Sequence, residues 1–261
     1  MIRLYFRFIG ISLKSQMQHR ASFFMLTIAH FLSTFVDIVG IWVLFDRFKM
    51  IQGWTLEELA LLYSIMQMGF AAAEIFSRAF DTFDLMIKKG GFDRILLRPL
   101  GTLFQIATSE VQLMRIGRFL QGTVVLFWSF HQMGFSFFSI ETVIILFAII
   151  GTTCLFSGLF IIQATLAFWT TETLEMMNIT TFGGMEVGQY PITIYKAPLR
   201  LFFTFIIPLA CVAFYPVSAL LHQGLVPFWF GTLAPAFGIA FLLLSFQFWK
   251  LGVRHYHSTG S

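Results

Sequence analysis

The sequence predicts an all-α integral membrane protein with six transmembrane helices. Hydrophobic residues make up 57% of the 261-residue chain and charged residues only 11%, whereas soluble domains carry roughly 25% charged residues. A membrane-spanning helix needs about 20 predominantly apolar residues, so the length allows about six spans and no separate soluble domain. We therefore expect one transmembrane domain over residues 1–261, whose most charged stretch is a hairpin between spans two and three.

The first predicted element is an amphipathic helix over residues 1–21. Four basic residues interrupt its hydrophobic side chains, at Arg3, Arg7, Lys14 and Arg20. This pattern lacks the continuous apolar core of a signal peptide. It is typical of a helix that lies in the headgroup region of a membrane, so we expect this helix to contact membrane lipids just before the first span.

Six apolar runs follow, and each is a predicted span. Spans one and two lie within residues 22–80, and a charged segment over residues 81–115 separates them from spans three to six, which lie within residues 116–250. The third span can start earlier, within residues 103–115, and residues 251–261 form a short tail. Apolar runs of this length indicate spans over residues 22–45, 56–80, 116–130, 142–170, 199–221 and 226–250.

The distribution of Lys and Arg predicts that both termini are cytoplasmic. With the N-terminus inside, every Lys and Arg except Arg47 and Lys49 falls on the inner side of the membrane, which is the bias seen in membrane proteins. The tryptophans then fall near the ends of the spans, where aromatic belts form. We expect a multi-pass protein of the cytoplasmic membrane, with the hairpin and the tail inside the cell.

The hairpin over residues 81–101 combines charged and apolar side chains. Gly90 and Gly91 divide it into two short amphipathic pieces, and Pro99 closes the second piece, because a proline disfavours helix at the residue before it. Basic residues in this position are explained by lipid headgroups alone. The apolar residues of the second piece, Phe92 and the run 95–97, must instead bury against lipid, the protein itself or a partner. Partner docking and lipid contact both remain open on this pattern.

Two carboxylates lie inside predicted spans. Asp37 is in the first span and Glu74 in the second, and an ionisable residue at membrane depth is a functional hypothesis by default. With a rise of about 1.5 Å per residue the two lie at different depths, so a shared ion site is not expected. The alternative for each is a structural contact between helices, or pairing with Arg78, Arg115 or Arg118.

Glycine and proline mark the region before the sixth span. Pro208, Pro216 and Pro227 predict a broken or re-entrant piece around residues 215–224. The segment 171–198 is predicted to be a structured cytoplasmic connector next to the hairpin, since clustered glycines and a proline indicate a specific backbone path. The residues expected to form this loop are Gly183, Gly184, Gly188, Gln189, Tyr190 and Pro191.

The motifs of enzymes and metal sites are missing from the sequence. No G-x-x-x-x-G-K-[ST] loop for nucleotide phosphates occurs, and no serine-hydrolase or H-E-x-x-H motif. The pair His255 and His257 is more typical of a solvated tail than of a metal site, and Cys154 and Cys211 lie in apolar runs, where small apolar packing is the expected role. We expect no catalysis, no metal and no nucleic-acid partner.

Four short motifs occur together along the chain. They are W-T-x-x-E-L from Trp54, G-F-D-R-x-L-L-R-P-L from Gly91, R-x-G-R-x-x-Q-G from Arg115 and G-Q-Y-P-x-x-x-Y from Gly188. Together they resemble the six-span permeases of ABC type-2 exporters, and the resemblance extends over nearly the whole chain. The second and fourth motifs are its most specific parts.

The resemblance implies a transmembrane half-transporter that moves its substrate out of the cell by alternating access. It implies a second permease, identical or homologous, and two copies of a cytoplasmic ATPase, which would bind ATP and Mg. In such exporters the N-terminal helix and the hairpin rest on the ATPase, so residues 81–115 would be a coupling segment. The first, second and fifth spans of two protomers would line the pathway, with Asp37 and Glu74 as candidates. The implied coupling contacts are Phe92, Asp93, Arg94 and Leu96.

A self-contained secondary transporter is the alternative from a different class. It would use Asp37 and Glu74 as proton or cation sites. An internal inverted repeat would favour this alternative, and none is visible in the sequence. Neither reading identifies a substrate, because phenylalanine-rich spans serve lipid contact as well as apolar cargo.

Overall fold

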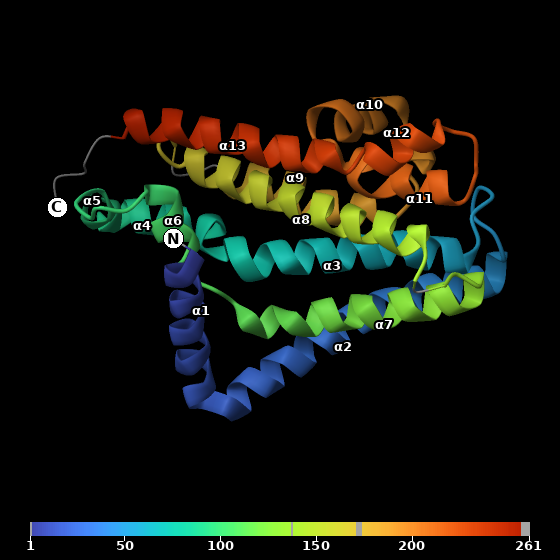
Figure 1. Cartoon of the computed structure of the whole chain (residues 1–261), viewed down its shortest axis with the longest axis horizontal. Helices are drawn as coiled ribbons and strands as arrows, with labels where there is room; N and C mark the ends of the chain where they lie inside the picture. Colours follow the sequence, from blue (N-terminus) through green and yellow to red (C-terminus); the bar gives the residue numbers. More distant parts are fainter. Residues whose placement is uncertain (1, 137, 171–173, 257–261) are drawn as a thin grey trace.

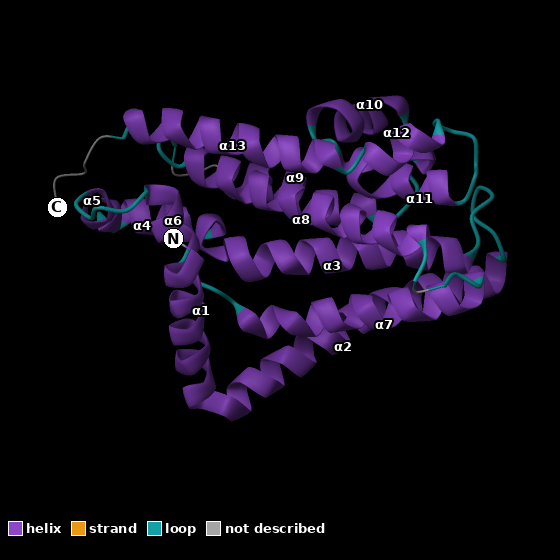
Figure 2. Cartoon of the chain, in the orientation of Figure 1, coloured by secondary structure: helices purple, strands orange, loops and turns teal. Residues whose placement is uncertain are grey.

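The computed structural model describes residues 2–136, 138–170 and 174–256. Over these residues the regular secondary structure consists of helices joined by turns and loops, and no strand is present (Figure 2). The long helices lie side by side in one bundle (Figure 1). We call the end of the bundle that carries the segment 81–101 the hairpin end, and the opposite end the far end.

Among the described residues, the longer helices run along the bundle. The chain passes to the far end in α2, returns in α3, passes out again in α7 and returns in α8; α9 then runs away from the hairpin end and α13 returns to it (Figure 1). Their bounds are Arg20–Phe48 for α2, Leu56–Asp81 for α3, Ile116–Met133 for α7, Ile140–Leu166 for α8, Leu174–Gly188 for α9 and Ala236–Arg254 for α13.

Helix α3 is the centre of the bundle. Its start is defined by a capping box in which the Thr55 hydroxyl accepts from the Glu58 amide (3.4 Å) and the Glu58 carboxylate accepts from the Thr55 amide (2.9 Å). The first sequence motif is therefore a helix start. Nearly every residue of α3 after Glu58 is buried, and the helix packs against α7, α8 and α9.

Helices α8 and α13 lie parallel and pack closely along small residues. These residues recur every seven positions, at Gly151, Gly158 and Thr165 on α8 and at Gly238, Ser245 and Gly252 on α13. A Cβ added to Gly238 would lie 2.1 Å from the Gly151 carbonyl oxygen, and one added to Gly252 would lie 2.6 Å from Thr165 Cγ2. Small residues at an interface let membrane helices approach closely, and we call this contact the α8–α13 seam.

Short helices form the hairpin end. Helix α1 lies across the direction of the bundle (Figure 1), and its Ser12 and Gln16 side chains donate to the Val111 carbonyl at 3.2 and 2.5 Å. A helix at the N-terminus is thus confirmed, ending at Gln16 and followed by a 3₁₀ turn. The short elements here are α1 (Ile2–Gln16), η1 (Met17–His19), α4 (Phe83–Lys88), α5 (Gly91–Leu96), α6 (Thr102–Ala107) and η2 (Leu113–Arg115).

The chain between α9 and α13 is broken into short pieces. The segments Ala197–Ile206 and Ala210–Leu220 are bent by 80° against each other, around Pro208. The predicted span over 199–221 is therefore broken, as its prolines suggested, but the break comes earlier than the predicted region 215–224, because Pro208 interrupts the backbone hydrogen bonds first. The pieces are η3 (Ile192–Ile194), α10 (Ala197–Leu201), η4 (Phe202–Ile206), η5 (Ala210–Phe214), α11 (Tyr215–Leu220) and α12 (Phe228–Leu233).

Helix α9 replaces most of the predicted connector over 171–198. It packs against α3 and α8 within the bundle, where Phe182 makes an edge-on contact with Phe70 at 5.4 Å between ring centroids. A Cβ on Gly188 would lie 2.3 Å from Met66 Cε. Gly188 thus allows α9 to pack closely on α3, and the prediction of a loop is wrong for residues 174–188, which form a helix.

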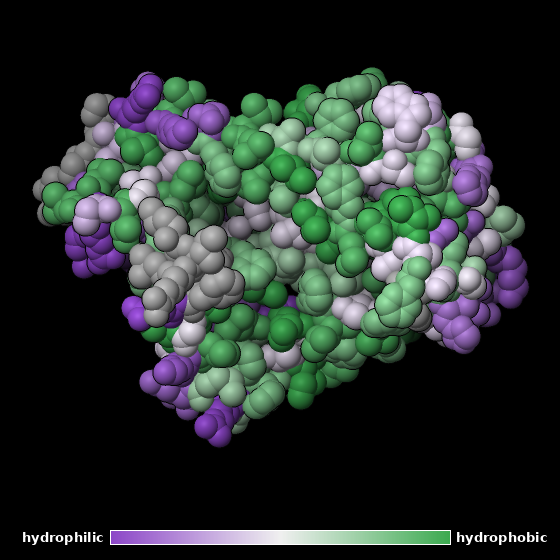
Figure 3. Space-filling model, in the orientation of Figure 1, coloured by the Kyte–Doolittle hydropathy of each residue, from purple (hydrophilic) through white to green (hydrophobic). Residues whose placement is uncertain are grey.

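The predicted number of six spans is only partly matched. Among the described residues, four helical segments are long and apolar enough to cross a membrane: Arg7–Phe48, Leu56–Lys88, Ile140–Leu166 and Phe228–Arg254. The bent pair between α9 and α13 would make a fifth. Hydrophobic residues gather across the middle of the molecule and hydrophilic ones at its two ends (Figure 3). This distribution fits a multi-pass membrane protein.

Candidate functional site

The hairpin is built from two short helices joined by a tight turn. Gly90 adopts a left-handed conformation (φ 63°) that ends α4 and starts α5, a conformation that glycine reaches without strain. The Gln105 amide nitrogen donates to the carbonyls of Ile95 (3.0 Å) and Leu100 (2.7 Å). These bonds hold the loop between α5 and α6, so the hairpin is an ordered part of the fold.

The predicted coupling residues divide into buried and exposed ones. Phe92 has 0% exposure and lies inside a cluster of aromatic rings, so its prediction as a surface contact is wrong. The Asp93 carboxylate accepts a hydrogen bond from the Tyr256 hydroxyl at 2.9 Å. Arg94 and Leu96 are exposed. Phe92 is buried because α5 has its own apolar face, which packs against the bundle.

The exposed side of the hairpin carries leucines together with basic residues. Leu97 is 86% exposed and Leu85 49% exposed, beside the 44% exposed Leu96. Neither Leu85 nor Leu97 is among the predicted coupling contacts, although Leu97 belongs to the apolar run 95–97. We call this set the hairpin surface: Leu85, Lys88, Lys89, Arg94, Leu96, Leu97 and Arg98.

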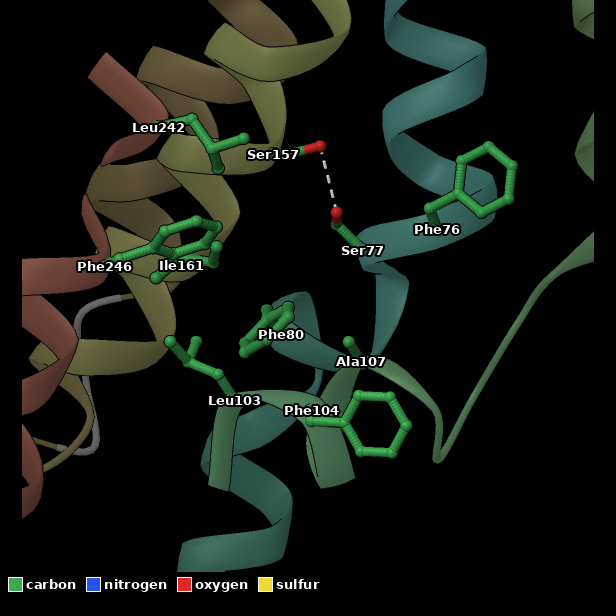
Figure 4. A pocket seen from close by; sticks show the side chains of 10 residues that line it. All are labelled: Phe76, Ser77, Phe80, Leu103, Phe104, Ala107, Ser157, Ile161, Leu242 and Phe246. Carbon is green, nitrogen blue, oxygen red and sulfur yellow. Dashed lines mark hydrogen bonds between the residues drawn. The ribbon is translucent and has the colours of Figure 1, made fainter. Parts of the chain in front are cut away.

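Two cavities lie near the hairpin end. One, of about 260 Å³, is lined by residues that include Arg94, Arg98 and Gln105 and opens beside the hairpin surface. The other, of about 440 Å³, lies between α3, α6, α8 and α13, and phenylalanine, leucine and isoleucine side chains make up most of its wall (Figure 4). In this second cavity Ser77 Oγ and Ser157 Oγ bond each other at 3.0 Å. Its mostly apolar wall offers room for hydrocarbon.

Glu74 is held in a buried ion cluster between α3 and α7. Its carboxylate has 0% exposure and lies 3.0 Å from Arg118 Nη1 and 3.5 Å from Arg115 Nη1. The Arg118 guanidinium also lies over the Phe70 ring, 5.3 Å from its centroid. Next to this cluster Arg78 pairs with Asp81. Glu74 is thus paired with two of the arginines that the structural alternative named.

Asp37 is placed differently. It is exposed on α2 and interacts electrostatically with Arg118 and with Tyr63 of α3. Glu186 of α9 and Tyr190, just after it, lie close enough to Asp37 for its charge to act on them. Glu186 is exposed as well. The structure thus adds Glu186 to Asp37, and the sequence analysis missed it because residue 186 was assigned to a cytoplasmic connector.

The residues of the predicted loop lie inside the bundle. Gly183 and Gly184 are within α9 and Gly188 is its last residue. The remaining three follow the helix: Gln189 is 2% exposed and donates to Met185 Sδ (3.0 Å), Tyr190 packs near Leu59 and Tyr63, and Pro191 precedes η3.

Metal-ligating side chains are scattered over the described part of the chain. No three histidine, cysteine, aspartate or glutamate side chains in this part are close enough together to hold a metal ion. His257 lies outside the described residues, so the pair His255 and His257 is not placed. Cys154 is half-buried and Cys211 buried, both as free thiols.

Comparison with known proteins supplies the family. The model of the ABC-2 family transporter proteins matches residues 31–260, which is most of the chain. The chain belongs to the ABC-2 transporter family. This family identifies the protein as a membrane transport subunit and implies association with an ABC ATP-binding subunit. No curated protein and no solved structure matches the chain.

The family match covers most of the helices described above. The matched range begins within α2 and ends beyond α13, so it contains every bundle helix after α2 and the whole hairpin.

Proposed function

We propose that this chain is the transmembrane permease of an ABC exporter, which moves its substrate across the cytoplasmic membrane by alternating access. The observation that carries the proposal, together with the family, is the hairpin surface. Leu97 is 86% exposed at an end of the bundle where the neighbouring exposed residues are basic. Apolar side chains of this size, ringed by charge, are typical of a protein contact site.

The partner that fits this surface is a cytoplasmic ATPase. Two copies would bind ATP and Mg and drive two permeases, this chain and a second one that is identical or homologous. The excess of Lys and Arg favours an orientation with the hairpin and both termini in the cytoplasm, where an ATPase is available. Arg94 and Leu96 remain coupling contacts in this proposal, joined by Leu97 and Leu85, whereas Phe92 and Asp93 support them from inside.

The pathway in this proposal runs along the side of the chain where Asp37 and Glu186 are exposed. Helix α2 has only three buried residues, Thr34, Ile41 and Phe45, so most of its surface is free for a second permease and for cargo. Carboxylates at membrane depth favour a substrate that carries positive charge or hydrogen-bond donors. Glu74 is not part of this pathway, since two arginines hold it.

The experiment that tests the proposal is purification of the chain in mild detergent after expression with its genomic neighbours, followed by an ATP hydrolysis assay. We expect an ATP-binding subunit to co-purify in stoichiometric amount. A chain that purifies alone, in a preparation that keeps its fold, would overturn the proposal and favour the secondary transporter, with Asp37 and Glu186 as the carboxylates to test.

Two variants test the docking surface within the same experiment. Leu97→Asp should abolish co-purification because it places a charge at the centre of an apolar contact. The matched control is Leu225→Asp, which changes an exposed leucine of the far end (52% exposed). Arg94→Glu and its far-end control Arg47→Glu test the basic part of the surface in the same way. Equal loss of the co-purifying ATP-binding subunit in a hairpin variant and in its far-end control would count against docking at the hairpin.

A further inference from the structure

Five aromatic rings join the hairpin to the C-terminal helix. Phe83 of α4 and Phe92 of α5 pack edge-on at 5.4 Å between centroids, and both contact Trp249 of α13, at 5.1 and 6.3 Å. Phe168, just after α8, and Tyr256, just after α13, close the cluster, at 5.2 and 4.9 Å from Phe92. Edge-to-face pairs at these distances are favourable beyond simple burial. The buried side of the hairpin is therefore attached to the ends of α8 and α13.

Two hydrogen bonds reach from α13 and its end to the two flanks of the hairpin surface. The Tyr256 hydroxyl donates to Asp93 Oδ1 at 2.9 Å, directly before Arg94. Trp249 Nε1 donates to Thr102 Oγ1 at 3.0 Å, shortly after Arg98. The residues 94–98 are thus held on both sides by one helix that is about 150 residues away in sequence.

The Tyr256 hydroxyl keeps its proton at neutral pH. Burial and the bond to the Asp93 carboxylate both raise the pKa of this phenol above its ordinary value. A phenol that stays protonated remains a donor, and a bond to an ionised acceptor is stronger than one between neutral groups. In the bond between the end of α13 and α5, the Tyr256 hydroxyl is therefore the donor and the Asp93 carboxylate the acceptor.

The seam between α8 and α13 extends this attachment along the bundle. At Gly238 the backbone of α13 packs against the backbone of α8, and at Gly252 it packs against the side chains of Thr165 and Phe168, so the two helices cannot slide past each other without a clash. At its far end α13 continues from α12, which packs against α11 of the bent segment. Movement of the hairpin can therefore be transmitted to the far end through the packed helices α8 and α13. This connection is separate from the covalent link of the hairpin to α3.

We propose that Tyr256 and Trp249 are positioning residues that transmit movement of the hairpin surface to the α8–α13 seam. This inference rests on the proposed function, because it requires an ATPase that moves the hairpin. It assigns Tyr256, just after α13, a part in transmission: its bond to Asp93 acts as a latch on α5. Movement of the hairpin then reaches α3 through the covalent chain and α13 through the latch.

The test is hydrogen–deuterium exchange on the complex of this chain with its ATPase, with and without Mg·ATP and vanadate. In the unaltered protein we expect nucleotide to change amide exchange in α5 and in α13. Tyr256→Phe keeps the ring contacts and removes only the hydroxyl, so the change in α13 should be lost while the change in α5 remains. The matched control is Tyr63→Phe, which removes a buried hydroxyl bonded to the Thr34 carbonyl at 2.8 Å and should leave the α13 response intact.

Changes at Asp93 separate transmission from general stability. Asp93→Asn keeps an acceptor oxygen and should preserve the α13 response, whereas Asp93→Leu should abolish it. Adding Tyr256→Phe to Asp93→Leu should have no further effect, as expected for two residues that act through one bond. An α13 response that persists in Tyr256→Phe would overturn the latch and leave the proposed function standing. Failure of any ATP-binding subunit to co-purify would overturn both.

Discussion

Replacing Glu74 by leucine removes the acidic partner of two arginines in the middle of the bundle. The carboxylate is completely buried and lies 3.0 Å from Arg118 and 3.5 Å from Arg115. Leucine matches the apolar surroundings, since Phe70 and its neighbours on α3 are buried, so the main effect is on the two guanidinium groups. They are left charged in a site from which most water is excluded, with no carboxylate to balance them.

The size of the effect follows from the burial of the arginines. Removing one partner of a buried ion pair costs about 3–5 kcal/mol. The side chains of Arg115 and Arg118 are 18% and 17% exposed, so solvent offsets part of the cost. We expect the free energy of unfolding to fall by about 3 kcal/mol. At roughly 2–4 °C per kcal/mol for a chain of this size, the midpoint of thermal unfolding should fall by roughly 6–12 °C.

The two free cysteines provide the assay. Cys211 is buried and Cys154 half-buried, so a dye that fluoresces on reaction with thiols reports their exposure as the detergent-solubilised protein is heated. Glu74→Leu combined with Arg118→Leu should recover part of the loss, because it removes one stranded charge. The control Asp46→Leu breaks a pair with Lys49 whose side chains are 70% and 80% exposed, and it should change stability by less than about 1 kcal/mol. An unfolding midpoint for Glu74→Leu equal to that of Asp46→Leu would refute the structural role of the ion cluster.

Three further predictions concern α9 and the surface beside it. Gly188→Leu should destabilise the chain by about 1–3 kcal/mol in the same assay, since a side chain there collides with Met66 and Leu209. The control is Gly10→Leu, because Gly10 has open space around it. An unchanged unfolding midpoint for Gly188→Leu would show that α9 does not pack here. Asp37→Asn should leave the midpoint unchanged and alter the rate or preference of export, because this carboxylate is exposed; a lower yield of folded protein with normal export would make it structural. Glu186→Gln should shift export in the same direction as Asp37→Asn, and opposite shifts would argue against a common site.

Composition was sufficient to predict a helical membrane protein, and the motifs were sufficient to suggest its family. Two short helices, α4 and α5, fall within the charged stretch that Gly90 divides and Pro99 closes in the sequence, whereas its role as a cytoplasmic coupling hairpin stays a prediction. What the sequence could not show is which side of a six-residue helix is buried. Phe92 and Leu96 both look like exposed apolar residues beside charges, and only the packing of α5 on Trp249 and Phe168 separates them.

The glycines of α9 explain the largest error. Three glycines within six residues are typical of a loop, whereas in a helix bundle a glycine can instead permit close packing of helices. Gly188 is needed where α9 meets Met66 of α3. Once residues 174–188 were assigned to a connector, Glu186 was placed outside the membrane and its proximity to Asp37 was lost. The pairing of Glu74, by contrast, was among the stated alternatives, because Arg115 and Arg118 were the nearest basic residues that another span could supply.

The most direct test of the central claim is site-specific photo-crosslinking from Leu97, in cells that express the chain with its genomic neighbours. A photoreactive amino acid at this 86% exposed position should form a covalent product with an ATP-binding subunit, and the same amino acid at Leu225 of the far end should not. Products from Leu225 but not from Leu97, or labelling of Leu97 by a membrane-impermeant reagent added outside intact cells, would contradict the proposal that the hairpin is the cytoplasmic docking surface of an ABC permease.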